Sequence, residues 1–265
     1  MQRLITLTTD FGVQDHYAGT MKGVILNINP AAQIVDVCHA VEAYDVLNGA
    51  LTIVQAYPYF PANTIHVVVI DPGVGTARRP ILVDTGRQLF IAPDNGVLSL
   101  VFEREEHIVV RHITASHYFL PNVSATFQGR DIFAPVAAYI SKGVEPAVVG
   151  EVIDDYLRFA VRRPKAESNR RVRGIVLKVD KFGNLVTNIR PADIPQLFER
   201  QPPPFRILVG KAEIRSVRRV FAEGAPDEVF ALLGSMGFLE IVVNRGSATQ
   251  VLAVGKNSEV EVVFD

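Results

Sequence analysis

Apolar residues in the first 70 positions follow two periods in turn, that of a buried strand and that of an amphipathic helix. Uniformly apolar runs predict the strands, and between these runs hydrophobic residues recur at helical spacing. Asp15 and Asp45 stand where the N-caps of the two helices are expected. Asn29-Pro30 ends the first helix and Pro58 the second. The order strand, helix, strand, helix, strand predicts a parallel sheet with crossover helices. The apolar runs with the length of buried strands are residues 4–8, 34–37 and 65–70.

Shorter elements continue this pattern to about residue 141. Two apolar runs joined by a turn at Gly86 predict a β-hairpin over residues 81–84 and 89–92. The other predicted elements are a helix at 97–102, a strand at 108–113 and a helix at 131–141.

A charged segment without periodicity, residues 162–173, predicts the boundary between two domains, 1–162 and 172–265. Short strands separated by Gly, Pro and Asn turns then predict a small antiparallel barrel or sandwich. The predicted fold class is α/β, with an N-terminal domain on a mostly parallel sheet and a smaller C-terminal β domain. Its predicted elements are strands at 174–179, 206–209, 228–233, 239–243, 249–254 and 259–264, and one helix at 192–198.

Composition excludes several classes of function. The 265 residues carry a net charge of -1, which provides no basic surface for nucleic acid. No apolar run reaches the roughly 20 residues of a membrane helix, and the N-terminus lacks the pattern of a signal peptide. The single cysteine, Cys38, is interpreted as a buried structural thiol and fits a reducing cytoplasm.

Polar loops with an aspartate follow three of the predicted strands, at Asp10, Asp71 and Asp94. Ligands in open α/β sheets bind beyond the carboxyl ends of the strands, so this rim is the first candidate site. A single such aspartate is more often a turn or cap residue, and Asp94, in an Asp-Asn-Gly turn, is interpreted as structural. Together, carboxylates on one rim favour binding a ribose diol, a base role or a metal.

The loop from Asp71 to Arg78, DPGVGTAR, resembles the start of a dinucleotide fingerprint. Arg78 stands in place of the third glycine, however, and no helix with an apolar stripe follows, which argues against a nicotinamide site. The chain also lacks a Walker loop, a GxSxG elbow and paired Cys/His metal spacing.

In the second domain, Asp180-Lys181-Phe182-Gly183-Asn184 interrupts a predicted strand. One interpretation is a hairpin loop with a β-bulge at Gly183. The other is a purine site, in which Phe182 supplies a stacking face and Asn184 a donor and an acceptor. Spacing alone does not separate the two.

Taken in order, the motifs TTDFG, IVDVCH, DPGVGTARR, PDNG, TFQGRDIFAP, DKFGN and SMGFLEI resemble the S-adenosylmethionine hydroxide adenosyltransferase family, relatives of fluorinase and chlorinase. The resemblance runs from residue 4 to about 254. It implies an N-terminal α/β domain, a C-terminal β-barrel and a homotrimer that binds S-adenosylmethionine between one subunit's N-terminal domain and its neighbour's barrel. The implied reaction is substitution at the ribose C5' by water or hydroxide, giving adenosine and methionine without a metal or cofactor.

The resemblance also implies roles for individual residues. Asp71 and Arg78 match two members of the family's water-activating Asp, Arg, His set. The implied substrate contacts are Asp10 and Tyr44 at the ribose, Phe182, Asn184 and Asn244 at the adenine, and Asp180 and Ser235 at the amino acid group of methionine.

Gln128 stands where the family's TFHGRD motif has its histidine. An amide orients a water by hydrogen bonds but does not accept its proton near neutral pH. The leading hypothesis is therefore a hydrolase with Asp71, Arg78 and Gln128 as its catalytic residues. The alternatives are a catalytically weak S-adenosylmethionine or adenosine binding protein, and a chloride adenosyltransferase. The charge of Asp71 and the lack of a hydroxyl at Gly129 disfavour halide transfer.

Overall fold

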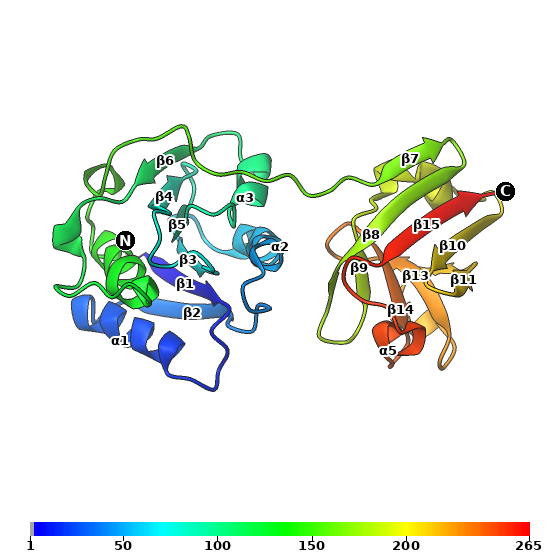
Figure 1. Ribbon diagram of the computed structural model, residues 1–265, viewed down its shortest axis with the longest axis horizontal. Helices are drawn as coiled ribbons and strands as arrows, with labels where there is room; N and C mark the ends of the chain where they lie inside the picture. Colours follow the sequence, from blue (N-terminus) through cyan, green and yellow to red (C-terminus); the bar gives the residue numbers. More distant parts are fainter. Residues whose placement is uncertain (1–2) are drawn as a thin grey trace. The chain divides into compact units, whose positions relative to one another are not determined.

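The computed structural model describes residues 3–265, which divide into one compact unit ending at Ala160 and a second beginning at Val161. The chain has a mixed α/β fold with two sheets (Figure 1). Residues 165–168 and 171–173, inside the segment predicted to separate the domains, form strand β7 and the start of β8.

The first unit contains a six-stranded sheet in the order β2-β1-β3-β5-β4-β6. The pairs β1–β2, β1–β3 and β3–β5 are parallel, whereas β4 pairs antiparallel with β5 and with β6, so the sheet is mixed. The predicted hairpin is confirmed as β4–β5. The strands are β1 (Leu4–Thr9), β2 (Gln33–Cys38), β3 (Ile65–Val69), β4 (Pro80–Asp84), β5 (Leu89–Pro93) and β6 (Val109–His112).

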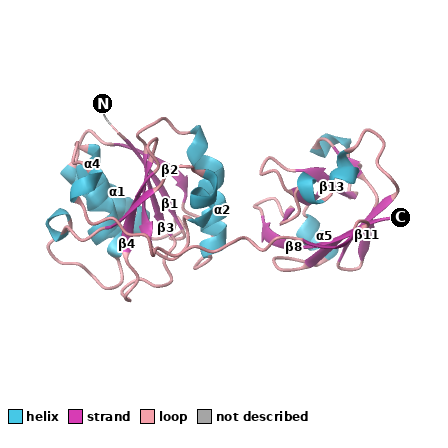
Figure 2. Cartoon of the chain, turned by 90° about the horizontal axis from the view of Figure 1, so that it is seen from above, coloured by secondary structure: helices cyan, strands magenta, loops and turns pink. Residues whose placement is uncertain are grey.

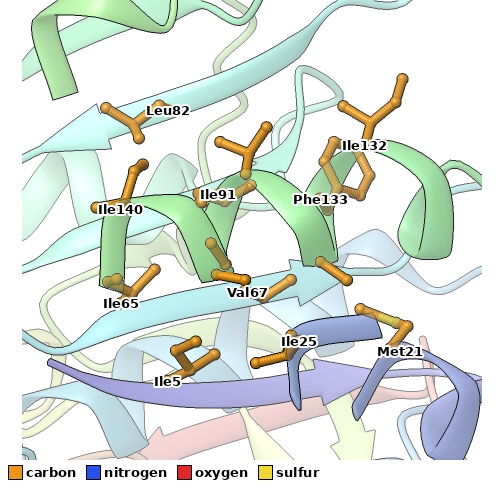
Figure 3. Close-up of a cluster of buried hydrophobic side chains, with 14 of the residues drawn as sticks. Ile5, Met21, Ile25, Ile65, Val67, Leu82, Ile91, Ile132, Phe133 and Ile140 are labelled. Atoms are coloured by element: carbon orange, nitrogen blue, oxygen red, sulfur yellow. The ribbon is translucent and has the colours of Figure 1, made fainter. Parts of the chain in front are cut away.

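Helices cover both faces of this sheet, with α1 and α4 on one side and α2 on the other (Figure 2). Met21 and Ile25 of α1 and Phe133 before α4 pack against Ile5 and Val67 of the strands (Figure 3). Since the chain passes from α1 on one face to α2 on the other, the crevice beyond β1 and β3 is a topological switch point. The helices are α1 (Tyr17–Ile28), α2 (Val46–Ala56), α3 (Ser99–Arg104) and α4 (Ala134–Ser141), with 3-10 turns at Tyr57–Tyr59, Ser116–Tyr118 and Pro146–Val148.

Two helix starts separate a confirmed prediction from a wrong one. Asp45 caps α2, because its side chain accepts a hydrogen bond from Asn48 N at 3.1 Å. Asp15 does not cap α1: the helix begins at Tyr17, its N-cap is His16, and no side-chain cap bond forms. The helix predicted over 131–141 begins earlier, as a π-helical turn at Gly129–Phe133 that leads into α4.

The second unit is a nine-stranded sheet in the order β11-β10-β15-β8-β9-β14-β13-β12, with β7 beside β8. All its pairs are antiparallel except β12–β13. Because residues from β8 to β15 share one core, the sheet curls around that core. The strands are β7 (Lys165–Ser168), β8 (Arg171–Val179), β9 (Leu185–Thr187), β10 (Phe205–Val209), β11 (Ala212–Ile214), β12 (Val217–Arg218), β13 (Val229–Leu233), β14 (Leu239–Val243) and β15 (Glu259–Phe264).

Three predictions in this unit are corrected. Residues 249–254 were predicted as a strand, but helix α5 (Ala248–Leu252) forms because Ser247 accepts a hydrogen bond from Gln250 N and caps it. The segment 192–198, predicted as a helix, forms two 3-10 turns instead. A third 3-10 turn follows β12. The shift of register between β8 and β9 falls between Val176 and Lys178, so Gly183 is a loop residue with φ of +85° and not a bulge. The turns are Pro191–Asp193, Pro195–Phe198 and Phe221–Glu223.

Candidate active site

A cavity of about 520 Å³ opens beyond the carboxyl ends of β1 and β3. Thr9 and Val69 are ladder partners at the ends of these two strands, which is why the residues that follow them meet. The sheet edge predicted from the sequence is therefore the edge that carries the cavity. Its lining includes Asp10, Phe11, His16, Tyr17, Tyr44, Asp71, Phe127, Gln128 and Arg130.

Asp10 and Tyr44 are joined directly, because Tyr44 N donates a 2.8 Å hydrogen bond to Asp10 Oδ2. Tyr44 has a φ of +66°, a conformation uncommon for a residue with a β-carbon, and its side chain is exposed. Burial raises the pKa of Asp10, and the nearby charge of Asp71 adds to this effect. The main chain thus holds a carboxylate and an aromatic side chain together at the rim.

Asp71, Arg78 and Gln128 form one connected group. Arg78 Nε donates to both oxygens of Asp71, at 3.0 and 2.9 Å, and Arg78 Nη2 donates to Asp71 Oδ2 and, at 2.5 Å, to Gln128 Oε1. The side chains of Asp71 and Arg78 are only 5% and 7% exposed. The structure therefore brings together the three residues that the sequence analysis put in one catalytic set.

Gly75 allows the two loops of this group to approach each other. Its φ is +79°, and a β-carbon there would come 2.3 Å from the carbonyl oxygen of Ala125. Ala125 and Gln128 lie in the same loop, residues 124–128. A side chain at position 75 would therefore push this loop away from the loop that contains Asp71 and Arg78. Glycine is required at this position for both conformation and space.

Sequence reasoning missed the aromatic wall of the cavity. Phe11, Tyr17 and Phe127 pack edge to face or tilted, with ring centroids 5.1 to 5.9 Å apart. Arg130 lies over Phe127 at 5.0 Å and also pairs with buried Asp131. TTDFG and TFQGRD both contain a phenylalanine beside a polar site residue, and this was the available signal.

Asp94 lies outside the cavity lining and is 3% exposed. Its Oδ2 accepts hydrogen bonds from Arg79 at 3.0 and 2.7 Å, and its Oδ1 accepts one from Leu157 N at 2.8 Å. These contacts tie the segment near residue 157 to the sheet, which agrees with a structural role. Cys38 is partly buried, and Ala40 N donates to its sulfur.

A second cavity, of about 990 Å³, lies in the second unit and is lined by all five residues predicted there. Asp180 organises the loop after β8, because its carboxylate accepts hydrogen bonds from Phe182 N, Asn184 N and Asn184 Nδ2 at 2.8 to 2.9 Å. Phe182 is 74% exposed, so its ring is accessible for stacking. The five residues are Asp180, Phe182, Asn184, Ser235 and Asn244.

Glu240 and Lys178 also line this second cavity and were missed by the sequence analysis. Burial raises the pKa of Glu240 to about 6, and the nearby charge of Asp180 contributes to the same shift. A single charged residue in an otherwise apolar strand such as 239–243 is ordinarily interpreted as solvent-facing, so nothing in the sequence singled out Glu240.

Within residues 3–265, no group of three or more His, Cys, Asp or Glu side chains is arranged to hold a metal ion. The same residues include no helix with both the length and the apolar character needed to cross a membrane.

Comparison with known proteins identifies relatives along nearly the whole chain. Family profiles described as the N-terminal and C-terminal domains of SAM hydroxide adenosyltransferase match residues 5–150 and 174–261. A protein of Thermus thermophilus named (R)-S-adenosyl-L-methionine hydrolase is 33% identical, with 98% of this chain and 100% of the relative covered. One of Salinispora tropica with the same name is 35% identical, with 97% of each chain covered.

More distant sequences and solved structures complete the comparison. A fluorinase of Actinoplanes is 29% identical over 72% of this chain and 73% of the relative. The crystal structure of an uncharacterized conserved protein from Thermotoga maritima has a TM-score of 0.90 and 39% identity, with 98% of this chain and all of that chain covered.

Proposed function

This chain belongs to the SAM hydroxide adenosyltransferase family, and we propose that it hydrolyses S-adenosyl-L-methionine to adenosine and L-methionine. The observation that carries the proposal is that Asp71 and Gln128, which line one cavity with Asp10, are connected by hydrogen bonds from Arg78. The family match and the names of the nearly full-length relatives support the same reaction.

In the proposed reaction, a water oxygen forms a bond to the ribose C5' as the bond from C5' to sulfur breaks. The electron pair of that bond returns to sulfur, so the sulfonium becomes the neutral thioether of methionine, and the water releases one proton. A sulfonium is already a good leaving group, and therefore the proposal includes no metal or cofactor. Aligning the nucleophile with the breaking bond contributes on the order of 7 to 11 kcal/mol in favourable model systems.

Each residue of the group has a proposed role in this step. Asp71 orients the water and receives its proton, while Arg78 holds the carboxylate in place. Gln128 fixes the water by hydrogen bonding, since its amide does not titrate near neutral pH. Because Arg78 already donates to both carboxylate oxygens, orientation contributes more than proton abstraction.

Asp10 is the proposed ligand of the ribose hydroxyls, with Tyr44 packed beside the sugar. Both lie at the rim of the cavity that contains Asp71, and this proximity supports a ribose position with C5' near Asp71. From the resemblance, the proposal also includes contacts to the adenine from Phe182, Asn184 and Asn244, and contacts to the amino acid group from Asp180 and Ser235. It further includes a cytoplasmic homotrimer, in which each subunit has a mostly parallel first sheet and a closed C-terminal barrel.

Halide transfer is the alternative reaction, because fluorinases are among the relatives. Two observations favour water over a halide. Asp71 brings a negative charge to the nucleophile position. At Gly129, a β-carbon would lie 3.3 Å from Met21 Sδ and 3.5 Å from Phe11, so the position is crowded and offers no hydroxyl to an anion.

The test is to incubate the purified chain with S-adenosyl-L-methionine, with and without chloride, and to quantify adenosine and methionine by chromatography. Since the relatives' name specifies the (R) epimer at sulfur, both epimers are assayed. We expect equal amounts of the two products, independent of chloride and of a metal chelator. A chlorinated nucleoside would indicate halide transfer, and binding without turnover would indicate a catalytically weak binding protein.

Two variants test the assignment of the site. Asp71→Asn keeps the shape of the side chain and removes its charge, and we expect it to abolish turnover while substrate still binds. Arg78→Ala is expected to do the same. Unchanged adenosine formation by both variants would show that the reaction takes place elsewhere. Light scattering checks the proposed trimer, which requires three times the mass of one chain.

A further inference from the structure

His39, which follows β2 directly, is a buried histidine that the proposed reaction does not use. Its side chain is 7% exposed, and both ring nitrogens have close contacts. Nδ1 lies 2.9 Å from Thr9 Oγ1. Nε2 lies 3.0 Å from Asp36 Oδ1, although this contact lacks the angle of a hydrogen bond. Neither His39 nor Thr9 lines the cavity of the first unit, so any effect of His39 on the site is exerted through its neighbours.

An irregularity in the pairing of β1 and β2 brings His39 level with the end of β1. The two strands are parallel, and their register shifts by one residue between Leu7 and Thr8. Without this shift Cys38 would lie beside Thr9, whereas the observed pairing of Thr8 with Cys38 puts His39 there. Such irregularities next to binding sites serve to re-aim a side chain. This one directs an imidazole, and not a thiol, toward the end of β1.

The turn after β1, residues 10–12, is attached to His39 at two points. Phe11 N donates a 3.3 Å hydrogen bond to Thr9 Oγ1, so the hydroxyl that contacts the imidazole also holds the turn. Gly12 N donates to the main-chain oxygen of His39 at 2.6 Å. The side chain and the main chain of one residue therefore both contribute to the position of this turn.

The hydrogen bonds of this group define where the protons lie. An ionised carboxylate only accepts, so the contact with Asp36 favours the imidazole tautomer that carries its proton on Nε2. Nδ1 is then an acceptor for the hydroxyl proton of Thr9, and the Thr9 oxygen can still accept from Phe11 N. Lys22 of α1 donates to the other oxygen of Asp36 at 2.6 Å. A chain of polar contacts thus runs from α1 through β2 to the turn.

A hydroxyl, an imidazole and a carboxylate in this order also occur in hydrolase triads, but the geometry here does not fit a nucleophile. Thr9 is 0% exposed, so its hydroxyl does not reach a substrate. It faces Nδ1 of His39, whereas the nucleophile of a triad faces Nε2. The contacts therefore hold the backbone of the turn.

We propose that His39 is a positioning residue, which holds the turn of residues 10–12 and thereby sets the direction of the Asp10 carboxylate. The inference rests on the proposed function, in which Asp10 binds the ribose hydroxyls. Tyr44 N fixes the carboxylate itself by donating to Oδ2, while the turn fixes the main chain from which the side chain extends. A binding group is precise only when such supporting contacts hold it, and His39 supplies the second of the two.

The first test measures KM for S-adenosylmethionine in His39→Leu, alone and combined with Asp10→Asn. Loosening the turn should raise KM about 3- to 10-fold with kcat within about 2-fold, because a contact to the ribose hydroxyls binds ground state and transition state alike. If His39 acts through Asp10, adding His39→Leu to Asp10→Asn should raise KM by less than about 2-fold. An unchanged KM in His39→Leu, or the same rise in both backgrounds, would overturn the inference.

Two further variants separate positioning from a general loss of stability. His39→Asn keeps a nitrogen at the place of Nδ1, so it retains the contact with Thr9 and its KM should stay within about 2-fold of the wild type. His66→Leu removes a contact of the same kind in the middle of β1, that of His66 Nδ1 with Thr6 Oγ1 at 2.7 Å, and should leave KM unchanged. A rise in His66→Leu, or an equal rise in His39→Asn and His39→Leu, would assign His39 a structural role only.

Hydrogen exchange tests the inference without substrate. Mass spectrometry of peptides that cover residues 10–12 should show exchange at least about 10-fold faster in His39→Leu, and at the wild-type rate in His66→Leu. Unchanged exchange in His39→Leu would overturn the inference while leaving the hydrolase intact. If wild-type protein forms no adenosine, the proposed function fails, and exchange still decides whether His39 holds the turn.

Discussion

Replacing Arg78 by methionine tests the central ion pair of the candidate site. Methionine keeps much of the side-chain length but leaves the Asp71 carboxylate, 5% exposed, without its guanidinium and Gln128 Oε1 without its donor. Removing one partner of a buried pair typically costs about 3 to 5 kcal/mol, because an uncompensated charge stays buried. We therefore expect Arg78→Met to lower the free energy of unfolding of the first unit by about this amount.

A double-mutant cycle isolates the interaction of this pair. Asp71→Asn removes the carboxylate charge that Arg78→Met leaves unpaired. The double variant Arg78→Met, Asp71→Asn should therefore regain at least about 2 kcal/mol of the stability that Arg78→Met alone loses. Urea unfolding is followed by far-UV circular dichroism, since the chain has no tryptophan. Each unit has its own core, so the data are fitted with two transitions, and only that of the first unit should shift.

The control is Arg206→Met in the second unit, whose pair with Asp265 is exposed and 3.1 Å long. Exposed pairs contribute less than about 1 kcal/mol, so this variant should be close to wild type. The reasoning fails if Arg78→Met costs no more than the control, or if the two changes in the cycle are additive.

Three further predictions concern the backbone at Gly75, the amide of Gln128 and the buried His66. Gly75→Ala should lower the free energy of unfolding by about 1 to 3 kcal/mol and reduce adenosine formation. The control Gly23→Ala should do neither, because a β-carbon at Gly23 meets open space. Urea unfolding and the product assay compare the two variants. Gln128→His should increase kcat and introduce a rise of kcat between about pH 6 and 7, absent from the wild type. Burial lowers the pKa of His66 to about 3. The unfolded chain binds a proton at this side chain near pH 6.5, whereas the folded chain does not. The free energy of unfolding should therefore fall as pH decreases from about 6.5 to 3, by up to about 1.4 kcal/mol per pH unit. Urea unfolding at a series of pH values measures this fall, which should be smaller in His66→Phe.

The sequence predicted the first unit well because its signals are local. Uniformly apolar runs mark strands that are buried on both faces, and the residues after β1 and β3 necessarily share one sheet edge. Asp71 and Arg78 lie seven residues apart in a loop, so their proximity also follows from local sequence. Gln128, 50 residues beyond Arg78, entered the set through the family resemblance, since no periodicity connects it to the loop.

The errors arose where a short local interaction outweighed side-chain preference. Thr249 and Val251 are β-branched and favour a strand, but the Ser247 cap starts a helix there. The strands β9, β11 and β12 have three, three and two residues, too few for a periodic pattern. Glu240 was missed for a different reason, because the sequence of a strand does not tell whether a given face meets solvent or a cavity.

The hydrogen bonds around Gln128 bear on how the proposed site would act without a histidine. Its Oε1 accepts from Arg78, so the amide nitrogen is the group left to donate to the oxygen of an attacking water. Both Asp71 oxygens already accept hydrogen bonds from Arg78, which leaves fewer lone pairs of this carboxylate free to accept the proton of the water. The site therefore offers the water strong orientation and weak proton acceptance. Such a balance suits a reaction in which a sulfonium leaves as a neutral thioether, since the water's proton need be lost only after the bond to carbon has begun to form.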